Sequence, residues 1–546
     1  MEKRVLIAVL LSIAVMYGYS FLVTPSPKVK KEISEPITQK QISTERVSSA
    51  KIESPVPPEV PVITAGVRDV VVETDLYSAV FSTSGGAVKR FILKKYSEGT
   101  DPKSPRISLI DEKLPGNYSL RTSGIGIPLN PIAVYSVNVD RLMVKGNEKK
   151  TLEFVTTLEK GIEVKKTYLF TGDHYAVGLE QRIINRGADK LEGSLQLLEK
   201  NLYVKDPKET SYDVHGATTF ADNSLHVQKL KDLEKEAKNL GGSILWSGFE
   251  NKYFLSAAIS ENGSIAQVQI KQDGGYIENV ISSPRLVLGP GESATVSYGL
   301  FFGPKDLDIL KAQGNRLEEV IDFGWFSAIA KPLLYALKFF YKYVNNYGIA
   351  IIIITVILKI LFYPLTNKSY KSMKEMQKLQ PKMEALKEKY KNDREAMNRA
   401  VMELYKTHKV NPMGGCLPML IQIPVFFALY KALMYSIELR HAPFMLWIND
   451  LSAPDALFGV IPSGIPLMGG FPIGPLPLLM GATMVIQQKM TPSNMDPMQA
   501  RIFMAMPIIF TFMFLNFPSG LVLYWLVNNI LTIIQQAYIN KSLKEA

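Results

Sequence analysis

The chain has 546 residues, of which 47% are hydrophobic, and this apolar content favours a protein that is partly embedded in a membrane. Its formal net charge of +11 at pH 7 is compatible with nucleic-acid binding and with the basic cytoplasmic loops of membrane proteins. Cys416 is the one cysteine, so the sequence excludes an intramolecular disulfide and a cysteine-based metal cluster.

The chain opens with a segment that we expect to anchor it in a membrane. Residues 5–23 carry no charge, and a run of this length can just cross ~30 Å of hydrocarbon. A cleavable secretory signal is the alternative, but the run is long for one and residues 17–19, Tyr-Gly-Tyr, make a poor cleavage site. We therefore expect an uncleaved anchor over residues 1–23. Lys3 and Arg4 place its N-terminus in the cytoplasm.

Two segments of different composition follow the anchor. Residues 24–66 are rich in Pro, Ser, Lys and Glu without a sustained apolar period, which indicates a flexible linker. Residues 67–320 consist of short alternating stretches separated by Gly and Asn, a pattern typical of a large antiparallel β-sandwich. Residues 228–240 interrupt this pattern, and we expect an exposed helix or a long polar loop there.

Apolar segments dominate the remainder of the chain. Residues 325–344 carry lysines among aromatic residues, which predicts an amphipathic helix at the membrane surface. Spanning helices are expected beyond it and, together with the N-terminal anchor, they make six. Their approximate ranges are 348–366, 417–437, 472–487, 503–516 and 521–538.

A basic segment, residues 367–412, separates the first two of these spans. It holds 12 Lys or Arg against 6 acids, so we expect it in the cytoplasm together with both termini. Apolar residues at spacings of three and four predict an antiparallel helical hairpin, whose first arm Pro381 should kink or restart. Its basic faces are expected either to be solvated or to dock RNA or acidic headgroups. The candidate recruitment residues are Lys382, Lys387, Lys389 and Arg394.

A lysine, Lys359, lies inside the span expected at residues 348–366. A lysine that faces lipid at mid-membrane costs about 2.5 to 3.5 kcal/mol, so an intramembrane cation usually faces a polar cavity. Thr355 lies one turn earlier on the same helix face, and polar residues recur in the later spans. The alternative is that the long side chain of Lys359 reaches the lipid headgroups.

Long stretches of the sequence resemble the YidC family of membrane protein insertases, which has mitochondrial and chloroplast relatives. They include IIIITVILKILFYPLT, VNPMGGCLPMLIQIPVFFALY, ELRHAPFMLWINDLSAPD and FPSGLVLYWLVNNILTIIQQ, and the resemblance runs nearly continuously from about residue 350 to 540. Earlier in the chain, TSGGAVKRFILKKY and LFFGPKDLDIL are similar to the first and last strands of the periplasmic β-sandwich of this family in double-membraned bacteria.

The resemblance implies an α-helical polytopic protein of the bacterial inner membrane with a large all-β periplasmic sandwich domain. Five helices within residues 348–540 would form the insertase core, and residues 541–546 a short cytoplasmic tail. The groove cation usually described as arginine in this family matches Lys359, which keeps the charge but loses the bidentate fork. The implied groove residues are Lys359, Thr355, Gln422, Tyr524, Trp525, Asn529 and Gln535.

In function, the resemblance implies a non-enzymatic insertase and chaperone that works with or without the Sec translocon. Its partners would be nascent membrane proteins, the Sec translocon with its accessory subunits, the translating ribosome and membrane lipids, without direct DNA binding. No cofactor is expected. An energy-coupling site is not required, and the sequence has no G-x-x-x-x-G-K-[ST] loop.

Without the family resemblance, the residues leave two other classes of function to consider. A transporter would use Lys359 as a substrate or proton site, but the sequence shows no inverted repeat with paired broken helices. An enzyme in the β domain could use His174 and His215. Neither metal-ligand spacing nor a nucleophile elbow accompanies these histidines.

Overall fold

The computed structural model describes most of the chain after residue 65. The described residues are 66–111, 118–202, 216–234, 236–273, 276–391, 393–408, 410, 417–462, 464–465, 469–490 and 497–545. Every described residue belongs to one compact unit, Ser49–Ala546. The expected anchor over residues 1–23 lies outside the described residues, and so do Cys416, His215 and the expected linker up to residue 65.

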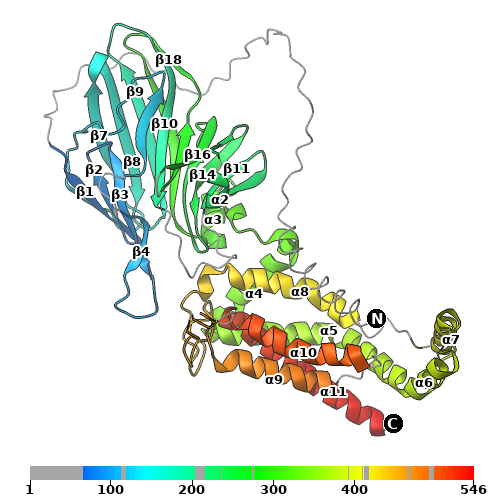
Figure 1. Ribbon diagram of the computed structural model, residues 1–546. Helices are drawn as coiled ribbons and strands as arrows, with labels where there is room; N and C mark the ends of the chain where they lie inside the picture. The colour runs from blue at the N-terminus through cyan, green and yellow to red at the C-terminus, as the bar shows by residue number, and fades with distance from the viewer. Residues whose placement is uncertain are drawn as a thin grey trace, which may run out of the picture. The chain divides into compact units, whose positions relative to one another are not determined.

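The first half of the described chain forms three β-sheets (Figure 1). Their strands are β1 (Asp69–Glu73), β2 (Tyr77–Ser82), β3 (Ala87–Ser97), β4 (Arg106–Ile110), β5 (Arg121–Ile125), β6 (Arg141–Met143), β7 (Lys149–Leu158), β8 (Ile162–Thr171), β9 (Ala176–Asn185), β10 (Leu191–Leu202), β11 (Gly216–Ala221), β12 (Ser224–Lys229), β13 (Lys238–Leu240), β14 (Ile244–Glu250), β15 (Phe254–Ser260), β16 (Gln267–Asp273), β17 (Tyr276–Ser282), β18 (Leu286–Leu288) and β19 (Ser293–Pro304).

Strand pairing within these sheets is almost entirely antiparallel. The largest sheet has the order β12-β11-β14-β15-β19-β9-β8-β7, and the second has the order β13-β16-β17-β10-β18, with β5 also paired to β10. The third sheet has the order β4-β3-β2-β1-β6, in which β1 and β6 pair in parallel. The expectation of a β-rich domain in this half of the chain is confirmed.

Alternation along the strands builds the core of this β domain, because successive side chains of a strand point to opposite faces. The buried residues of β8 are Ile162, Val164, Lys166, Tyr168 and Phe170. Lys166 is thus a lysine at a core position. Its ammonium donates hydrogen bonds to the carbonyl oxygens of Gly85 at 3.1 Å and Leu120 at 2.6 Å, and burial lowers its pKa to about 7.

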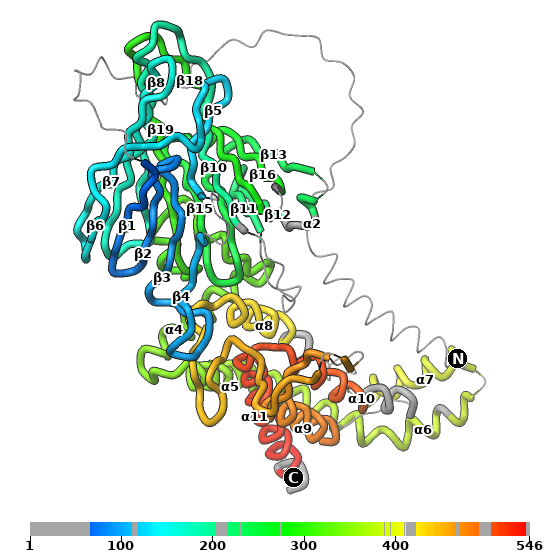
Figure 2. Tube along the Cα trace, turned by 60° about the vertical axis from the view of Figure 1, so that its left-hand side comes forward, coloured from blue at the N-terminus to red at the C-terminus, as the bar shows by residue number. Residues whose placement is uncertain are grey.

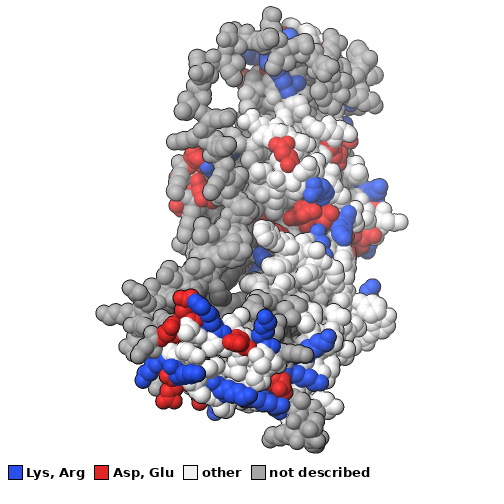
Figure 3. All heavy atoms as spheres, turned by 90° about the vertical axis from the view of Figure 1, so that its right-hand side faces the viewer, with Lys and Arg blue, Asp and Glu red and all other residues white. Residues whose placement is uncertain are grey.

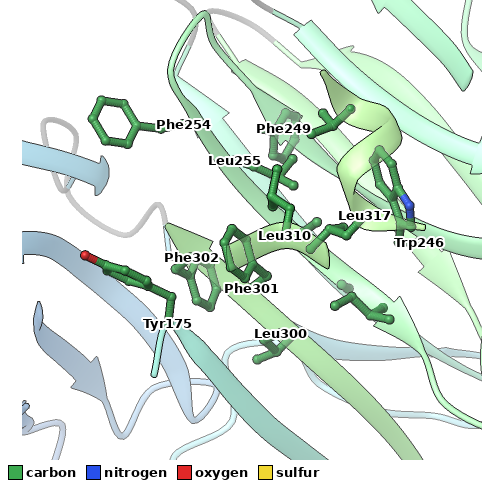
Figure 4. Close-up of a cluster of buried hydrophobic side chains, with 14 of the residues drawn as sticks. Tyr175, Trp246, Phe249, Phe254, Leu255, Leu300, Phe301, Phe302, Leu310 and Leu317 are labelled. Atoms are coloured by element: carbon green, nitrogen blue, oxygen red, sulfur yellow. The ribbon is translucent and has the colours of Figure 1, made fainter. Parts of the chain in front are cut away.

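A short helix, α3 (Leu307–Gln313), packs against this core through Leu307 and Leu310. Asp306 caps its N-terminus by accepting from the backbone N–H groups of Asp308 and Ile309. Figure 4 shows Leu310 of α3 in one cluster with Leu255 of β15 and Phe301 of β19. The helix is therefore part of the hydrophobic core of the β domain.

The second half of the described chain is helical. After the single turns η2 (Leu317–Val320) and η3 (Gly324–Phe326) come α4 (Ser327–Val344), α5 (Tyr347–Lys378), α6 (Gln380–Lys389), α7 (Arg394–Thr407), α8 (Leu417–Met434), η5 (Ile437–Leu439), α9 (Pro475–Met490), α10 (Pro497–Phe514) and α11 (Ser519–Glu545). Figures 1 and 2 both show α6 and α7 folded back on each other. These two helices lie within the segment of the predicted hairpin, and Pro381 starts α6 at its first turn, as expected.

Two of the described helices are long and apolar enough to cross a membrane, and they are Tyr347–Lys378 and the part Ser519–Lys541 of α11. Gln422–Met434 and Met504–Phe514 are apolar but shorter. The count of six spans is therefore not confirmed. Helix α5 continues through Pro364 to Lys378, so the expected span and the start of the basic segment form one helix.

The expectation for residues 228–240 is wrong in part. The structure places a four-residue helix, α2 (Leu230–Leu233), between strands β12 and β13. The segment is drawn into the sheets because β12 pairs with β11 and β13 pairs with β16. These tertiary pairings override a local sequence that is rich in Lys and Glu.

Candidate functional site

Helix α11 is the element around which the candidate site is built. It packs against α5, α8 and α9. Among its polar residues, Tyr524, Asn528, Asn529, Thr532 and Gln535 recur at spacings close to one helical turn. Each of these five side chains reaches a residue of another helix.

Lys359 of α5 meets this polar face of α11. Its ammonium donates to the hydroxyl oxygen of Thr532 at 2.6 Å, and the side-chain oxygen of Asn528 lies 3.5 Å away. Thr532 in turn donates to the backbone oxygen of Asn528 at 2.7 Å. Among the residues that the structure describes, no carboxylate pairs with Lys359. A half-buried cation is thus held by neutral oxygens alone.

The same face of α5 continues to contact α11 further along both helices. Gln535 donates from its side-chain amide to the hydroxyl of Thr366 at 2.7 Å, and these two residues are only 6% and 8% exposed. Two turns of α5 separate Lys359 from Thr366, a distance of about 10 Å along the axis. We call Lys359, Thr366, Asn528, Thr532 and Gln535 the polar seam between α5 and α11.

Two further hydrogen bonds tie α11 to its other neighbours. Gln422 of α8 donates to the hydroxyl of Tyr524 at 2.6 Å. Asn529 donates to the hydroxyl of Thr483 on α9 at 3.2 Å. Because Tyr524 and Asn529 are 2% and 3% exposed, both bonds lie inside the helical bundle, where an unpaired polar group would be costly.

Of the seven expected groove residues, only Lys359 and Gln535 belong to the polar seam. Gln422, Tyr524 and Asn529 lie instead at the contacts of α11 with α8 and α9, and Thr355 and Trp525 make other contacts. The hydroxyl of Thr355 donates to the backbone oxygen of Ile351 in its own helix at 2.7 Å. Trp525 packs edge-on against Phe426 with ring centroids 4.7 Å apart. Thr366 joins the seam although its sequence context did not single it out. A threonine near the expected end of a span carries no signal of a partner 169 positions away.

The basic hairpin residues are surface groups where they are described. Figure 3 shows Lys and Arg side chains interspersed with Asp and Glu on the face that carries the hairpin. The ammonium of Lys382 lies 3.0 Å from the ring nitrogen Nε2 of His408, and that of Lys389 lies 5.4 Å from the ring centre of Tyr390. The side chains of Lys387 and Arg394 fall outside the described residues.

Two family models match the chain. The model described as the YidC periplasmic domain matches residues 69–336, and the model described as the 60Kd inner membrane protein matches residues 339–546. The boundary between the two matches falls within α4. The two halves of the fold thus correspond to two recognised domains.

Solved structures resemble the chain only loosely. An active YidC insertase with its first transmembrane domain resolved aligns over 89% of this chain and 94% of its own, with 19% identity and a TM-score of 0.35. A galactose mutarotase related enzyme from Lactobacillus acidophilus aligns over 43% of this chain and 97% of its own, with 9% identity and a TM-score of 0.33. Neither likeness carries a functional argument.

Sequence relatives match along the whole chain. The membrane protein insertase YidC of Geotalea uraniireducens is 56% identical over 544 residues, which cover 100% of both chains. The proteins of the same name from Geobacter metallireducens and Geobacter sulfurreducens are each 54% identical, over 100% of this chain and 99% of theirs. With this identity along its full length and both domains matched, the chain belongs to the YidC family of membrane protein insertases.

Proposed function

We propose that the protein inserts integral membrane proteins into the bacterial inner membrane, and that the polar seam is its hydrophilic groove. The observation that carries the role of the groove is the position of Lys359, a half-buried ammonium that is bonded to Thr532 and paired with no described carboxylate. Such a cation can exchange a neutral oxygen for the carboxylate of an incoming chain. The names of the full-length relatives support the same function.

The proposed mechanism needs one charge and a hydrophobic driving force. Unit charges ~4 Å apart attract by about 4 kcal/mol at an effective dielectric near 20, against about 1 kcal/mol in water. Lys359 therefore draws the acidic or polar extracellular segment of a substrate into the seam. The apolar segment that follows partitions into lipid and leaves the groove, so this step needs no nucleotide.

The proposed topology has six spans, namely the N-terminal anchor, α5 and α8 to α11. The excess of Lys and Arg over residues 367–412 supports a cytoplasmic hairpin. Both termini are then cytoplasmic, whereas the β domain and the connection between α8 and α9 are periplasmic. Helix α4 lies at the periplasmic surface. It exposes the aromatic side chains of Phe339 and Tyr343, and Trp325, just before the helix, is also exposed.

The proposed partners follow from this topology. Nascent membrane proteins enter the seam, and membrane lipids receive them. The exposed residues Lys382 and Lys389, with Lys387 and Arg394 beside them in sequence, recruit the translating ribosome. The β domain faces the compartment in which accessory subunits of the Sec translocon would meet it.

Depletion of the protein from its native cell, followed by proteomics of the inner membrane, tests the proposed function. Small proteins with one or two spans should decline in the membrane fraction. Re-expression of the wild-type chain should restore them, whereas an equally abundant Lys359→Glu variant should not. Normal levels of these small proteins after depletion would reject an insertase role.

A further inference from the structure

A second cluster of cations shares no residue with the polar seam. It lines a hollow of about 720 Å³ between the β3–β4 hairpin and the connection that follows α8. The hairpin contributes the end of β3, the turn after it and Arg106 at the start of β4. Lys95 and Arg106 come from this hairpin, and Arg440 and His441 from the connection after α8. We call these four residues the basic hollow. In the proposed topology it opens on the periplasmic side of the membrane.

The cations of the hollow are held mostly by neutral oxygens. The guanidinium of Arg440 donates to the backbone oxygens of Ser97 at 2.5 Å and Glu98 at 3.2 Å, and that of Arg106 donates to the hydroxyl of Ser97 at 2.9 Å. Among the described residues, Lys95, Arg106 and Arg440 form no ion pair. Each therefore keeps its charge available to an anion.

The acidic groups near the hollow do not cancel this charge. Asp101 is the one carboxylate among the lining residues, and its side chain accepts from the backbone N–H of Lys103 at 2.8 Å. Asp450 lies 3.9 Å from the ring nitrogen Nε2 of His441 and accepts from the His441 backbone N–H at 3.1 Å. The carboxylates of Glu98 and Asp450 also act on Arg440, but neither residue lines the hollow. Three permanent cations against the single lining carboxylate therefore leave the lining itself positive, which favours an anion.

An exposed apolar tip lies next to this charge in the sequence. The connection that supplies Arg440 and His441 continues to Met445 and Leu446, whose side chains are 48% and 81% exposed. The tip is a formed turn, because the backbone N–H of Phe444 donates to the Ile448 oxygen at 2.9 Å. Exposed apolar side chains beside a cationic hollow match an amphiphile with an anionic head.

We propose that the basic hollow binds the phosphate of an anionic phospholipid from the periplasmic leaflet, with Met445 and Leu446 against its acyl chains. A free phosphate would leave the apolar tip without a partner, and so would an acidic peptide that is bound through charge alone. The bound lipid would contact the β3–β4 hairpin and the loop after α8 together. This role is separate from substrate capture at Lys359.

The test uses the full chain in phosphatidylcholine nanodiscs, with a fluorophore on Thr100→Cys in a Cys416→Ser background. Phosphatidylglycerol with a nitroxide on an acyl chain should quench this fluorophore at lower lipid fractions than equally labelled phosphatidylcholine. The double variant Lys95→Gln/Arg106→Gln should need an about tenfold higher phosphatidylglycerol fraction for the same quenching. The reason is that each basic residue near a surface contributes to anionic-lipid binding. Lys95→Arg/Arg106→Lys should retain binding.

The matched control is Arg141→Gln/Lys149→Gln, which removes two exposed cations of the β domain that do not line the hollow. This control should quench like the parent chain. Equal quenching by the two lipids, or an equal loss in the control, would overturn the proposal. Displacement of the lipid by inorganic phosphate or by a polyglutamate peptide at matched anion concentration would also overturn it, in favour of a free anion or an acidic protein segment.

Discussion

At the scale of single residues, the β domain contains a lysine whose charge opposes folding. Lys166 is fully buried, and burial lowers its pKa to about 7, whereas an unfolded lysine has a pKa near about 10.4. At a pH between these two pKa values, Lys166 is mostly protonated in the unfolded chain and mostly neutral in the folded chain, so the unfolded chain binds more protons. The contribution of this residue to stability therefore rises as the pH is raised from about 7 toward about 10.

Comparison of the wild-type chain with Lys166→Met isolates this effect. Methionine keeps a long apolar stem but cannot titrate or donate to the oxygens of Gly85 and Leu120. The thermal unfolding midpoint of the wild type should rise relative to that of the variant between pH 7 and about pH 10. The midpoints can be followed by circular dichroism of the full chain in detergent. A pH-independent difference would show that Lys166 titrates normally in the fold.

At the scale of elements, the polar seam should hold α5 and α11 together as well as admit substrates. Thr366→Val leaves the buried amide of Gln535 without its acceptor, and Gln535→Leu leaves the hydroxyl of Thr366 without that donor. The double variant removes both groups. In a double-mutant cycle the coupling should be about 0.6 kcal/mol and at most about 1.7 kcal/mol, as for other hydrogen bonds between membrane helices.

Thr355→Val is the matched control for this cycle. Thr355 lies on the same helix and is also buried, but the one described partner of its hydroxyl is the backbone oxygen of Ile351 in its own helix. It should therefore show no coupling to Gln535 when unfolding is measured in mixed detergent micelles. Coupling at Thr355, or none at Thr366, would contradict the described register of α5 against α11.

How far the sequence predicted these elements depends on how local their signals are. The alternating stretches of the β domain, the apolar spacing of the hairpin and the proline at the start of α6 are local signals, and each predicts the type of structure that is found there. The bond between Thr366 and Gln535 depends on the register of two helices 169 residues apart. The contact between Arg440 and Ser97 joins residues 343 positions apart and has no local signature.

In the segment around the short helix α2, a local signal is present but it indicates the wrong structure. Its surroundings are rich in Lys and Glu, so local propensity favours a solvated helix or loop. Pairing of β13 with β16 draws the segment into a sheet instead. A segment whose tertiary contacts compete with its composition is thus the hardest to predict from sequence.

At the scale of the whole molecule, the β domain should be separable from insertion. Its core of sheets and α3 contains none of the polar seam, all of which comes from α5 and α11. Deletion of residues 67–303, with α4 retained, should leave substantial insertion activity in reconstituted vesicles. The matched comparison is the full chain at equal abundance and equal detergent stability. Complete loss of activity in a stable deletion would contradict this separation.

In the proposed function, Lys359 captures acidic segments in a groove within the membrane. The most direct measurement is the insertion rate, in reconstituted vesicles, of two substrates that differ only in an acidic or a neutral translocated tail. Lys359→Arg should preserve the rates for both tails. Lys359→Ala should slow the acidic tail roughly tenfold relative to the neutral one, which corresponds to about 1.4 kcal/mol, and Lys359→Glu should slow it further. Wild-type rates for both tails in Lys359→Ala would contradict the claim and would indicate that this lysine only reaches the headgroups.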